Sequence, residues 1–141
     1  MFRRSHPSIG SLLVLLALAA GLVSCSADAG DPTGRTWTLL DLQGTAAIDG
    51  TMVTITFADG QVSGSGGCNN YTGSATWDAG SISIDPALAA TQVECDQPVM
   101  VQEQAFFSEL PTASSYSVDG DRLRLTADDG ETLATFTAAA P

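Results

Sequence analysis

The residues of this chain that are best suited to chemistry are its three cysteines, Cys25, Cys68 and Cys95. A cysteine thiolate can attack a substrate, ligate a metal ion or join a second cysteine in a disulfide. Nucleophilic attack by a cysteine thiolate is usually assisted by a histidine, and a structural zinc site takes four Cys or His ligands. The only histidine is His6, near the start of the chain, and there is no lysine. A disulfide is therefore favoured, with a catalytic thiol and a zinc site as the weaker alternatives.

The second chemically capable group is the set of sixteen Asp and Glu side chains. A glycosidase needs two carboxyl groups across a cleft, one of them with a raised pKa. Most of the acids here fall at expected turns, and the runs Asp119-Gly120-Asp121 and Asp128-Asp129-Gly130 lack the ligand spacing of a calcium loop. The sequence thus predicts that the protein is not an enzyme and has no metal and no cofactor, with a hydrolase built on Asp or Glu as the alternative.

Charge narrows the choice of partner. The 141 residues carry a formal net charge of −11, and all five basic residues are arginines. Arg3 and Arg4 lie in the leading segment, so the rest of the chain sets three arginines against sixteen acids, a net charge of −13. Nucleic acids and anionic lipid headgroups are bound mainly through Lys and Arg. We therefore expect no nucleic-acid partner.

Residues 1–24 are predicted to be a secretory signal peptide. Arg3 and Arg4 precede an apolar run, Ile9–Val23, that ends at small residues. A membrane span needs roughly 20 apolar residues, so an uncleaved N-terminal anchor is the weaker alternative. The segment ends in Leu22-Val23-Ser24-Cys25, which resembles the lipobox of bacterial lipoproteins.

The lipobox resemblance implies that Cys25 is lipidated and becomes the first residue of the mature chain. The protein would then be exported and anchored, on the extracytoplasmic side, to the bacterial cell membrane, because several acyl chains suffice for stable attachment. An ordinary signal peptide followed by a cysteine is the alternative. Residues 25–34 are predicted to form the lipidated cysteine and a flexible tether, since they are small, polar and turn-rich.

Assigning Cys25 to the lipid leaves Cys68 and Cys95 as a pair. Disulfides persist in exported proteins, so the pair is expected to be bonded. Such a bond closes a loop with a sequence separation of 27. The chain-entropy estimate for a loop of this length is a stabilisation of roughly 3.5 kcal/mol.

Residues 35–141 are predicted to form one small, mainly β domain. Apolar residues alternate most clearly at Met52–Ala58, where Val53, Ile55 and Phe57 share one face. Turn pairs such as Asp59-Gly60 separate the segments and are typical of hairpins. About eight strands are expected among the ranges 35–42, 52–58, 61–66, 74–78, 81–84, 88–93, 116–118, 123–125 and 132–137. Their spacing favours a small antiparallel meander barrel or a strongly curled sheet.

One α-helix is predicted at about 97–110. Pro98 suits a first turn, and Asp96 is a candidate N-cap whose carboxylate would accept hydrogen bonds from free backbone N–H groups. Apolar residues follow helical spacing and are interpreted as core, with the lining of a ligand site as the alternative: Val99, Met100, Phe106, Phe107 and Leu110.

A glycine-rich segment around Cys68 carries a resemblance to a known family. Val62-Ser63-Gly64, then Gly67-Cys68-Asn69-Asn70-Tyr71 and Gly73, resemble the signature of the META domain family, whose members include the heat-shock protein HslJ. Matching elements occur in order along the chain: Trp37-Thr38-Leu39, Thr91 with Cys95, Glu103 with Phe106 and Leu110, and Leu123 with Leu125. The resemblance covers nearly all of residues 35–137; Val93-Glu94 departs from the apolar or small residues often found before the second cysteine.

The resemblance implies a small antiparallel β-barrel with one helix, commonly carried on exported lipoproteins and in some members associated with the cell envelope or stress. The glycine-rich segment itself is interpreted as a structural turn, because glycine allows positive φ or close backbone approach and asparagine tolerates left-handed geometry. The residues assigned to this turn are Gly64, Gly67, Asn69, Asn70, Tyr71 and Gly73. A phosphate-binding loop is excluded by the lack of any lysine.

The predicted function is that of a non-enzymatic, membrane-anchored lipoprotein, monomeric, that acts by binding or in envelope and stress maintenance. Its partner, a protein or a small apolar ligand, is left open. One alternative is a small-ligand carrier with an apolar barrel pocket lined by Trp37, Phe57, Trp77 and Phe106. Another is a protease-inhibitor-like module acting through an exposed loop. Because an eight-stranded barrel can be filled by its own side chains or can hold one ligand, the state of the interior tests the carrier alternative.

Overall fold

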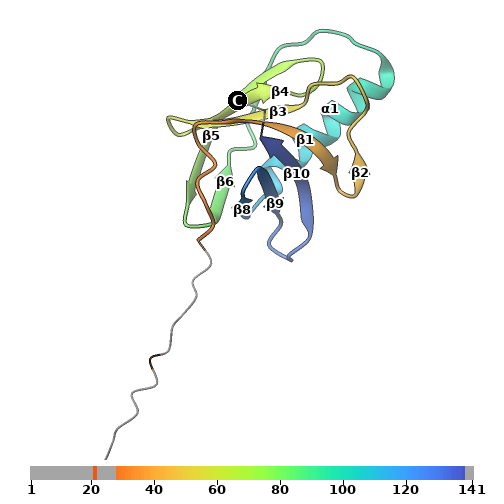
Figure 1. Cartoon of the computed structure of the whole chain (residues 1–141). Helices are drawn as coiled ribbons and strands as arrows, with labels where there is room; N and C mark the ends of the chain where they lie inside the picture. Colours follow the sequence, from red (N-terminus) through yellow and green to blue (C-terminus); the bar gives the residue numbers. More distant parts are fainter. Residues whose placement is uncertain (1–20, 22–27, 139–141) are drawn as a thin grey trace, which may run out of the picture.

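The protein folds into a closed antiparallel β-barrel of eight strands, as seen in a computed structural model that describes Gly21 and residues 28–138 (Figure 1). The predicted signal peptide apart from Gly21, the lipidation site Cys25 and the last three residues lie outside the described residues. The barrel strands are β1 (Thr36–Leu42), β3 (Thr54–Ala58), β4 (Gln61–Ser65), β5 (Asn70–Asp78), β6 (Ser81–Ile84), β8 (Ser115–Asp119), β9 (Arg122–Thr126) and β10 (Thr132–Ala138). Each strand pairs with the next in this order, and β10 returns to pair with β1, which closes the barrel and confirms the predicted fold class.

Two short strands lie outside the barrel. β2 (Thr45–Ala46) pairs only with β1, and β7 (Ala89–Ala90) pairs only with β5. β2 was not expected from the sequence, and the strand expected at 88–93 is reduced to β7. Both are therefore edge strands, each with one side unpaired in the sheet.

The hairpin turns follow the chemistry of their residues. At the predicted turn Asp59-Gly60 both φ angles are positive, 52° and 71°, as a type I′ turn requires. Ala79-Gly80 has the same signs, with φ of 46° and 91°. Gln43-Gly44, with φ of 49° and 79°, makes a third such turn between β1 and β2. Glutamine gives no turn signal, so the pattern of the sequence did not reveal this hairpin.

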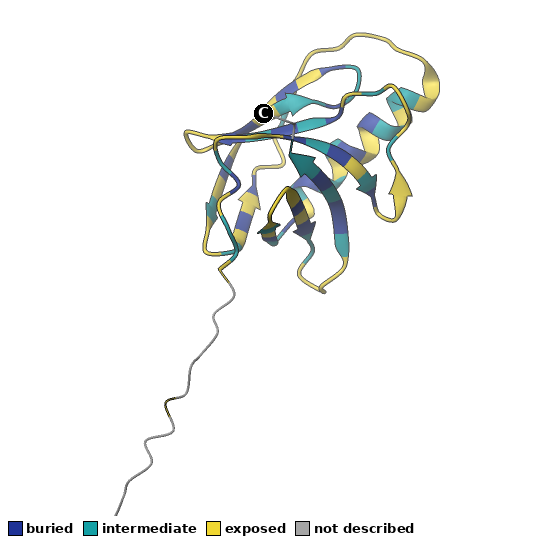
Figure 2. Cartoon of the chain, viewed as in Figure 1, coloured by how far each residue is buried: buried dark blue, intermediate teal, exposed yellow. Residues whose placement is uncertain are grey.

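The interior of the barrel is filled by its own side chains. Alternate residues of barrel strands such as β3 and β5 point inward and are buried, which gives the banded pattern along these strands in Figure 2. The largest side chains of this core are all almost completely inaccessible: Trp37, Ile55, Phe57, Phe106, Leu110, Leu123, Leu125 and Phe136. Phe106 and Phe136 approach edge to face, with ring centroids 6.3 Å apart.

Helix α1 (Gln97–Glu109) and the short 3-10 helix η1 (Leu110–Thr112) lie between β7 and β8 and contribute Phe106 and Leu110 to the core. The helix occurs where the sequence predicted it. The predicted capping role of Asp96 is wrong: its side chain makes no capping hydrogen bond. The Asp96 backbone carbonyl instead accepts from the N–H groups of Val99 and Met100, at 3.0 and 3.1 Å. Among the described residues, no helix is long and apolar enough to span a membrane.

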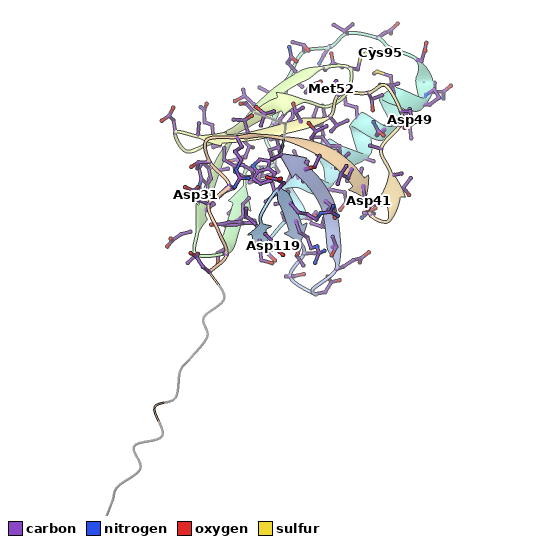
Figure 3. The ribbon with its side chains drawn as sticks, viewed as in Figure 1. Asp31, Asp41, Asp49, Met52, Cys95 and Asp119 are labelled. Carbon is purple, nitrogen blue, oxygen red and sulfur yellow. A yellow bond between two sulfur atoms is a disulfide. The ribbon has the colours of Figure 1, made fainter. Side chains whose placement is uncertain are left out.

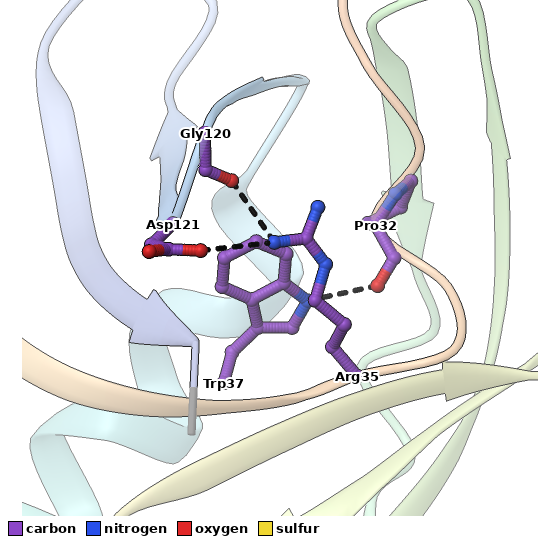
Figure 4. Close-up of polar contacts among 5 residues, drawn as sticks. All are labelled: Pro32, Arg35, Trp37, Gly120 and Asp121. Atoms are coloured by element: carbon purple, nitrogen blue, oxygen red, sulfur yellow. Dashed lines mark hydrogen bonds and ion pairs between the residues drawn. The ribbon is translucent and has the colours of Figure 1, made fainter. Parts of the chain in front are cut away.

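The structure shortens the predicted tether, because residues 28–34 pack against the barrel. The Ala29 carbonyl accepts a hydrogen bond from Val118 N–H of β8 at 2.6 Å. Pro32 is buried, and its carbonyl accepts from the indole N–H of Trp37 at 2.8 Å (Figure 4). β6 and β8 share a single register pair, Ser81 with Ser115. Beyond that pair, the side of β8 that does not face β9 is contacted by residues 28–34 through the hydrogen bond of Val118. Composition indicated flexibility here, but the buried proline and the indole contact fix the chain.

Candidate functional site

The predicted glycine-rich turn and the cysteine pair come together at one end of the structure. Residues 66–69 connect β4 to β5, and a disulfide joins Cys68 to Cys95, whose Cα atoms are 6.1 Å apart. Cys95 lies just before α1, so the bond ties the turn to the start of the helix (Figure 3). The structure thus contains the disulfide that the sequence favoured.

A buried carboxylate lies directly beneath this turn. Glu103 of α1 is 4% exposed, and its Oε2 accepts hydrogen bonds from the backbone N–H groups of Cys68 at 3.0 Å and Asn69 at 2.6 Å. Its Oε1 accepts from the side-chain Nδ2 of Asn69 at 2.6 Å. One carboxylate therefore serves three donors, which is the way a charge is accommodated in a protein interior.

Asn69 extends this cluster to the segment before the second cysteine. It is 3% exposed, and its Oδ1 accepts from Thr91 Oγ1 at 3.0 Å and from Val93 N–H at 2.6 Å. Thr91 Oγ1 in turn accepts from Asn70 N–H at 3.1 Å. Asn69 and Glu103, which we call the Asn69–Glu103 centre, thus join the turn, the segment 91–95 and α1.

The glycines near this centre are required for close packing. A Cβ at Gly66 would lie 2.7 Å from Glu103 Oε2 and 2.7 Å from Phe107 Cζ. A Cβ at Gly64 would collide with the backbone carbonyl of Thr54 on the neighbouring strand, and a Cβ at Gly73 with the side chain of Leu88. Gly67, by contrast, has a φ of 106°, which favours glycine for conformational reasons.

The structure divides the predicted turn into two parts. Gly67, Cys68 and Asn69 are turn residues, whereas Asn70, Tyr71 and Gly73 belong to β5, and Gly64 to β4. Tyr71 therefore points into the barrel, where its hydroxyl donates to the Thr54 carbonyl at 2.9 Å and its ring lies 5.7 Å from that of Phe106. Burial raises the pKa of the Tyr71 phenol. The alternation of Tyr71, Gly73 and Ala75 with the polar residues Thr72 and Ser74 was the sequence signal that β5 begins before residue 74.

The Asn69–Glu103 centre has the properties of a structural centre. Every buried side-chain nitrogen or oxygen in the described residues has a hydrogen-bond partner. The same residues contain no group of three or more His, Cys, Asp or Glu side chains placed to hold a metal ion. With its carboxylate engaged by three donors from the protein itself, Glu103 stabilises the turn and holds the helix in position.

The four residues proposed to line a carrier pocket do not share an open site. Trp37, Phe57 and Phe106 are 0–1% exposed and form part of the filled interior. Trp77 is half-buried and lies edge to face with Phe57, with ring centroids 5.3 Å apart. Trp77 borders a surface depression of about 200 Å³ formed with residues of β5 and β6, and Phe106 borders a second depression that is too narrow to admit a water molecule.

Two surface grooves lie on either side of the exposed face of α1. The first, of about 540 Å³, is lined by Gln97, Met100, Val101, Glu103, Gln104, Phe107 and Ser108. The second, of about 320 Å³, lies between α1 and the β1–β2 hairpin and is lined by Leu42, Gln43, Thr45, Ala46, Ile48, Pro98, Val101, Gln102 and Ala105. Val101 forms the ridge between them. Because the β1–β2 hairpin was not expected, sequence reasoning did not reveal the second groove.

Comparison with known proteins agrees with the fold. Residues 31–140 match the META domain family, and the chain belongs to this family. Among solved structures, one from Burkholderia xenovorans is similar with a TM-score of 0.62 and 23% identity, over 99% of this chain and 100% of the other. A DUF4847 family protein from Bacteroides vulgatus ATCC 8482 is similar with a TM-score of 0.55 and 19% identity, over 75% and 93% of the two chains. A search of curated proteins finds no significant match. At these identities the structural similarities concern the fold alone.

Proposed function

We propose that this META domain protein is a non-enzymatic lipoprotein, exported and held at the extracytoplasmic side of a bacterial membrane by a lipid on Cys25, and that it acts by binding a partner with its surface. The main observation that supports binding at the surface is that the interior of the barrel is filled. Trp37, Phe57, Phe106 and Phe136 occupy the barrel, and Glu103, a carboxylate inside the protein, is engaged by three donors. Recognition is therefore assigned to the outer surface.

The packed segment after the lipobox supports an anchor at a defined end of the barrel. Only Ser26 and Ala27 separate Cys25 from Asp28, and Ala29 already pairs with Val118. A lipid on Cys25 would hold this end near the membrane. Cys95 and the start of α1 lie at the far side of the barrel in Figure 3 and would face away from it.

Two further features support export and a surface role. The Cys68–Cys95 disulfide is of the kind that persists outside the cytoplasm. The described residues carry sixteen acids and three arginines, and one of these, Arg35, lies over the Trp37 ring at 4.9 Å and donates to the Gly120 carbonyl at 3.0 Å (Figure 4). A net charge of −13 favours cationic partners and opposes anionic ones.

The anchoring part of the proposal is tested by Cys25→Ser, with Ser26→Ala as the neighbouring control. We expect the control to stay in the membrane fraction and take up labelled palmitate, and Cys25→Ser to lose both properties. Unchanged labelling of the serine variant would contradict the lipid anchor.

The non-enzymatic part is tested by incubating the purified protein with esters, peptides, glycosides and phosphate esters. We expect no turnover above background. Saturable turnover that a single Asp→Asn or Glu→Gln change abolishes would contradict the proposal.

A further inference from the structure

The second groove brings together an unpaired strand edge and a helix. Ala47 N–H donates to the Leu40 carbonyl of β1 at 3.0 Å, so the N–H and C=O groups of the preceding residue, Ala46, point away from β1. Two residues further along the same edge, Ile48 N–H donates to Gln102 Oε1 of α1 at 2.7 Å. The helix thus already satisfies one donor of this edge, and within the described chain Ala46 is left without a partner for either backbone group.

Six of the nine residues that line this groove are apolar. Leu42 lines the strand side, and Pro98, Val101 and Ala105 line the helix side. Ile48 and Val101 are among the few large apolar side chains of the described surface that are clearly exposed, Val101 to 59%. A volume of about 320 Å³ suits one or two side chains of a peptide and is small for a cofactor.

The surroundings of the groove are acidic. Asp41 precedes Leu42 and Asp49 follows Ile48 (Figure 3), and Asp96 precedes the first residue of α1. Glu109, one helical turn beyond Ala105, lines a neighbouring depression together with Leu42. The lining residues themselves carry no charge. An apolar centre with an acidic surround is complementary to an apolar segment flanked by cationic residues.

We propose that this groove binds an extended segment of another protein that carries lysine or arginine beside apolar residues. The segment adds a strand to the free edge of β2, pairs with the backbone of Ala46 and places an apolar side chain over Leu42 between β2 and α1. This is strand addition in a groove formed by an edge strand and a helix. The inference rests on the proposed function, in that the protein acts by binding, and it names the surface and the class of partner.

Charge argues against a second copy of the chain as the partner, and shape argues against two other sites for the peptide. A second copy of this chain would bring together two domains of net charge −13. The edge of β7 is also free, but the depression beside it, which is lined by Asn70, Tyr71, Thr72, Ala89, Ala90 and Thr91, has no helix as a second wall. The first groove, beside Met100 and Phe107, offers no unpaired strand.

The test uses the protein as purified from the producing cell and two fluorescein-labelled nonapeptides. Both have a central Thr-Val-Thr-Val-Thr, and two lysines or two glutamates flank it at each end. We expect saturable binding of the lysine peptide, with amide shifts in ¹⁵N NMR spectra confined to β2, Ile48 and residues 99–105 of α1. The glutamate peptide should bind at least tenfold more weakly. Equal binding of both peptides, or shifts centred on β7, would overturn the proposal.

Matched variants distinguish binding of the peptide in the groove from its general electrostatic attraction to an acidic protein. Val101→Lys should weaken binding of the lysine peptide at least tenfold, whereas Val93→Lys, which adds the same charge at a residue that is 56% exposed and outside the groove, should change it about twofold or less. Ala46→Pro removes the outward N–H and should weaken binding at least fivefold, with Ala90→Pro on β7 as its control. Equal effects of the two lysine variants would overturn the proposal even if a proline variant failed to fold. Peptide binding by Cys25→Ser is expected to be unchanged, so failure of the anchor and failure of the groove are distinguishable.

Discussion

Replacing Glu103 by glutamine is the sharpest test of the Asn69–Glu103 centre. Glutamine keeps the shape of the side chain but exchanges one carboxylate oxygen for an NH₂ group. If its oxygen serves the N–H groups of Cys68 and Asn69, its NH₂ faces the Nδ2 of Asn69, another donor. Rotating the Asn69 amide does not solve this, because its Oδ1 already accepts from Thr91 and Val93.

The expected loss of stability in Glu103→Gln follows from the hydrogen bonds that the substitution removes or weakens. Hydrogen bonds to a charged group contribute about 1.5–3 kcal/mol, and Glu103→Gln removes one and weakens two. We expect the free energy of unfolding to fall by roughly 2–3 kcal/mol, and the thermal midpoint by roughly 8–15 °C for a domain of this size. Glu103→Ala leaves three donors without an acceptor and should cost about 3–6 kcal/mol, a large share of a typical total of 5–15 kcal/mol.

Thermal unfolding followed by circular dichroism measures the effect, and Glu109→Gln is the matched control. Glu109 lies on the same helix, and its carboxylate only accepts from Thr112 Oγ1 at 3.3 Å. Both changes remove one negative charge from a strongly acidic domain, so the general relief of repulsion is the same. Equal midpoints for the Glu103 and Glu109 variants would refute a stabilising role for the centre.

Two further predictions concern the disulfide and the buried phenol. Replacing Cys68 and Cys95 together by alanine should lower the free energy of unfolding by roughly 3.5 kcal/mol in urea titrations, and midpoints of the native protein that do not respond to reductant would contradict this. Because burial raises the pKa of Tyr71, the folded state keeps the phenol protonated while the unfolded state ionises near pH 10. Its stabilisation is present below about pH 10 and is lost as the pH rises further, so Tyr71→Phe should flatten the alkaline fall in stability between pH 9 and 11. An unchanged slope would show that Tyr71 is not responsible.

The barrel itself could be predicted from the sequence, because each strand carries its own signal. Alternation at Val53, Ile55 and Phe57 specifies one inward face, and Asp59-Gly60 supplies the positive φ angles that the next hairpin needs. The family signature around Cys68 then indicated a barrel with one helix. The closing of β10 on β1 follows from the meander order once eight twisted strands are present.

What the sequence did not predict depends on contacts between distant segments. Glu103 falls on the same helical stripe as Val99, Phe106 and Leu110, so a carboxylate at a core position was the available signal for a buried acid. Its partners, however, are backbone groups more than thirty residues away, and no local pattern identifies them. Residues 28–34 have the composition of a linker, and only the indole N–H of Trp37 and the position of Val118 show that they pack.

The structural centre and the proposed groove are connected through adjacent residues of one helix. The side chain of Glu103 points inward to Asn69, whereas that of Gln102 points the other way, to Ile48 N–H at 2.7 Å and to Thr51 Oγ1 at 3.1 Å. The position of α1 is therefore fixed on one side by the disulfide-linked turn and on the other by the loop that follows β2. A groove whose two walls are held in this way is formed before its partner arrives, which reduces the entropy lost on binding. Loosening the Glu103 contacts should for this reason weaken binding of the lysine peptide as well as stability, although Glu103 lies beneath the turn and outside the lining of the groove.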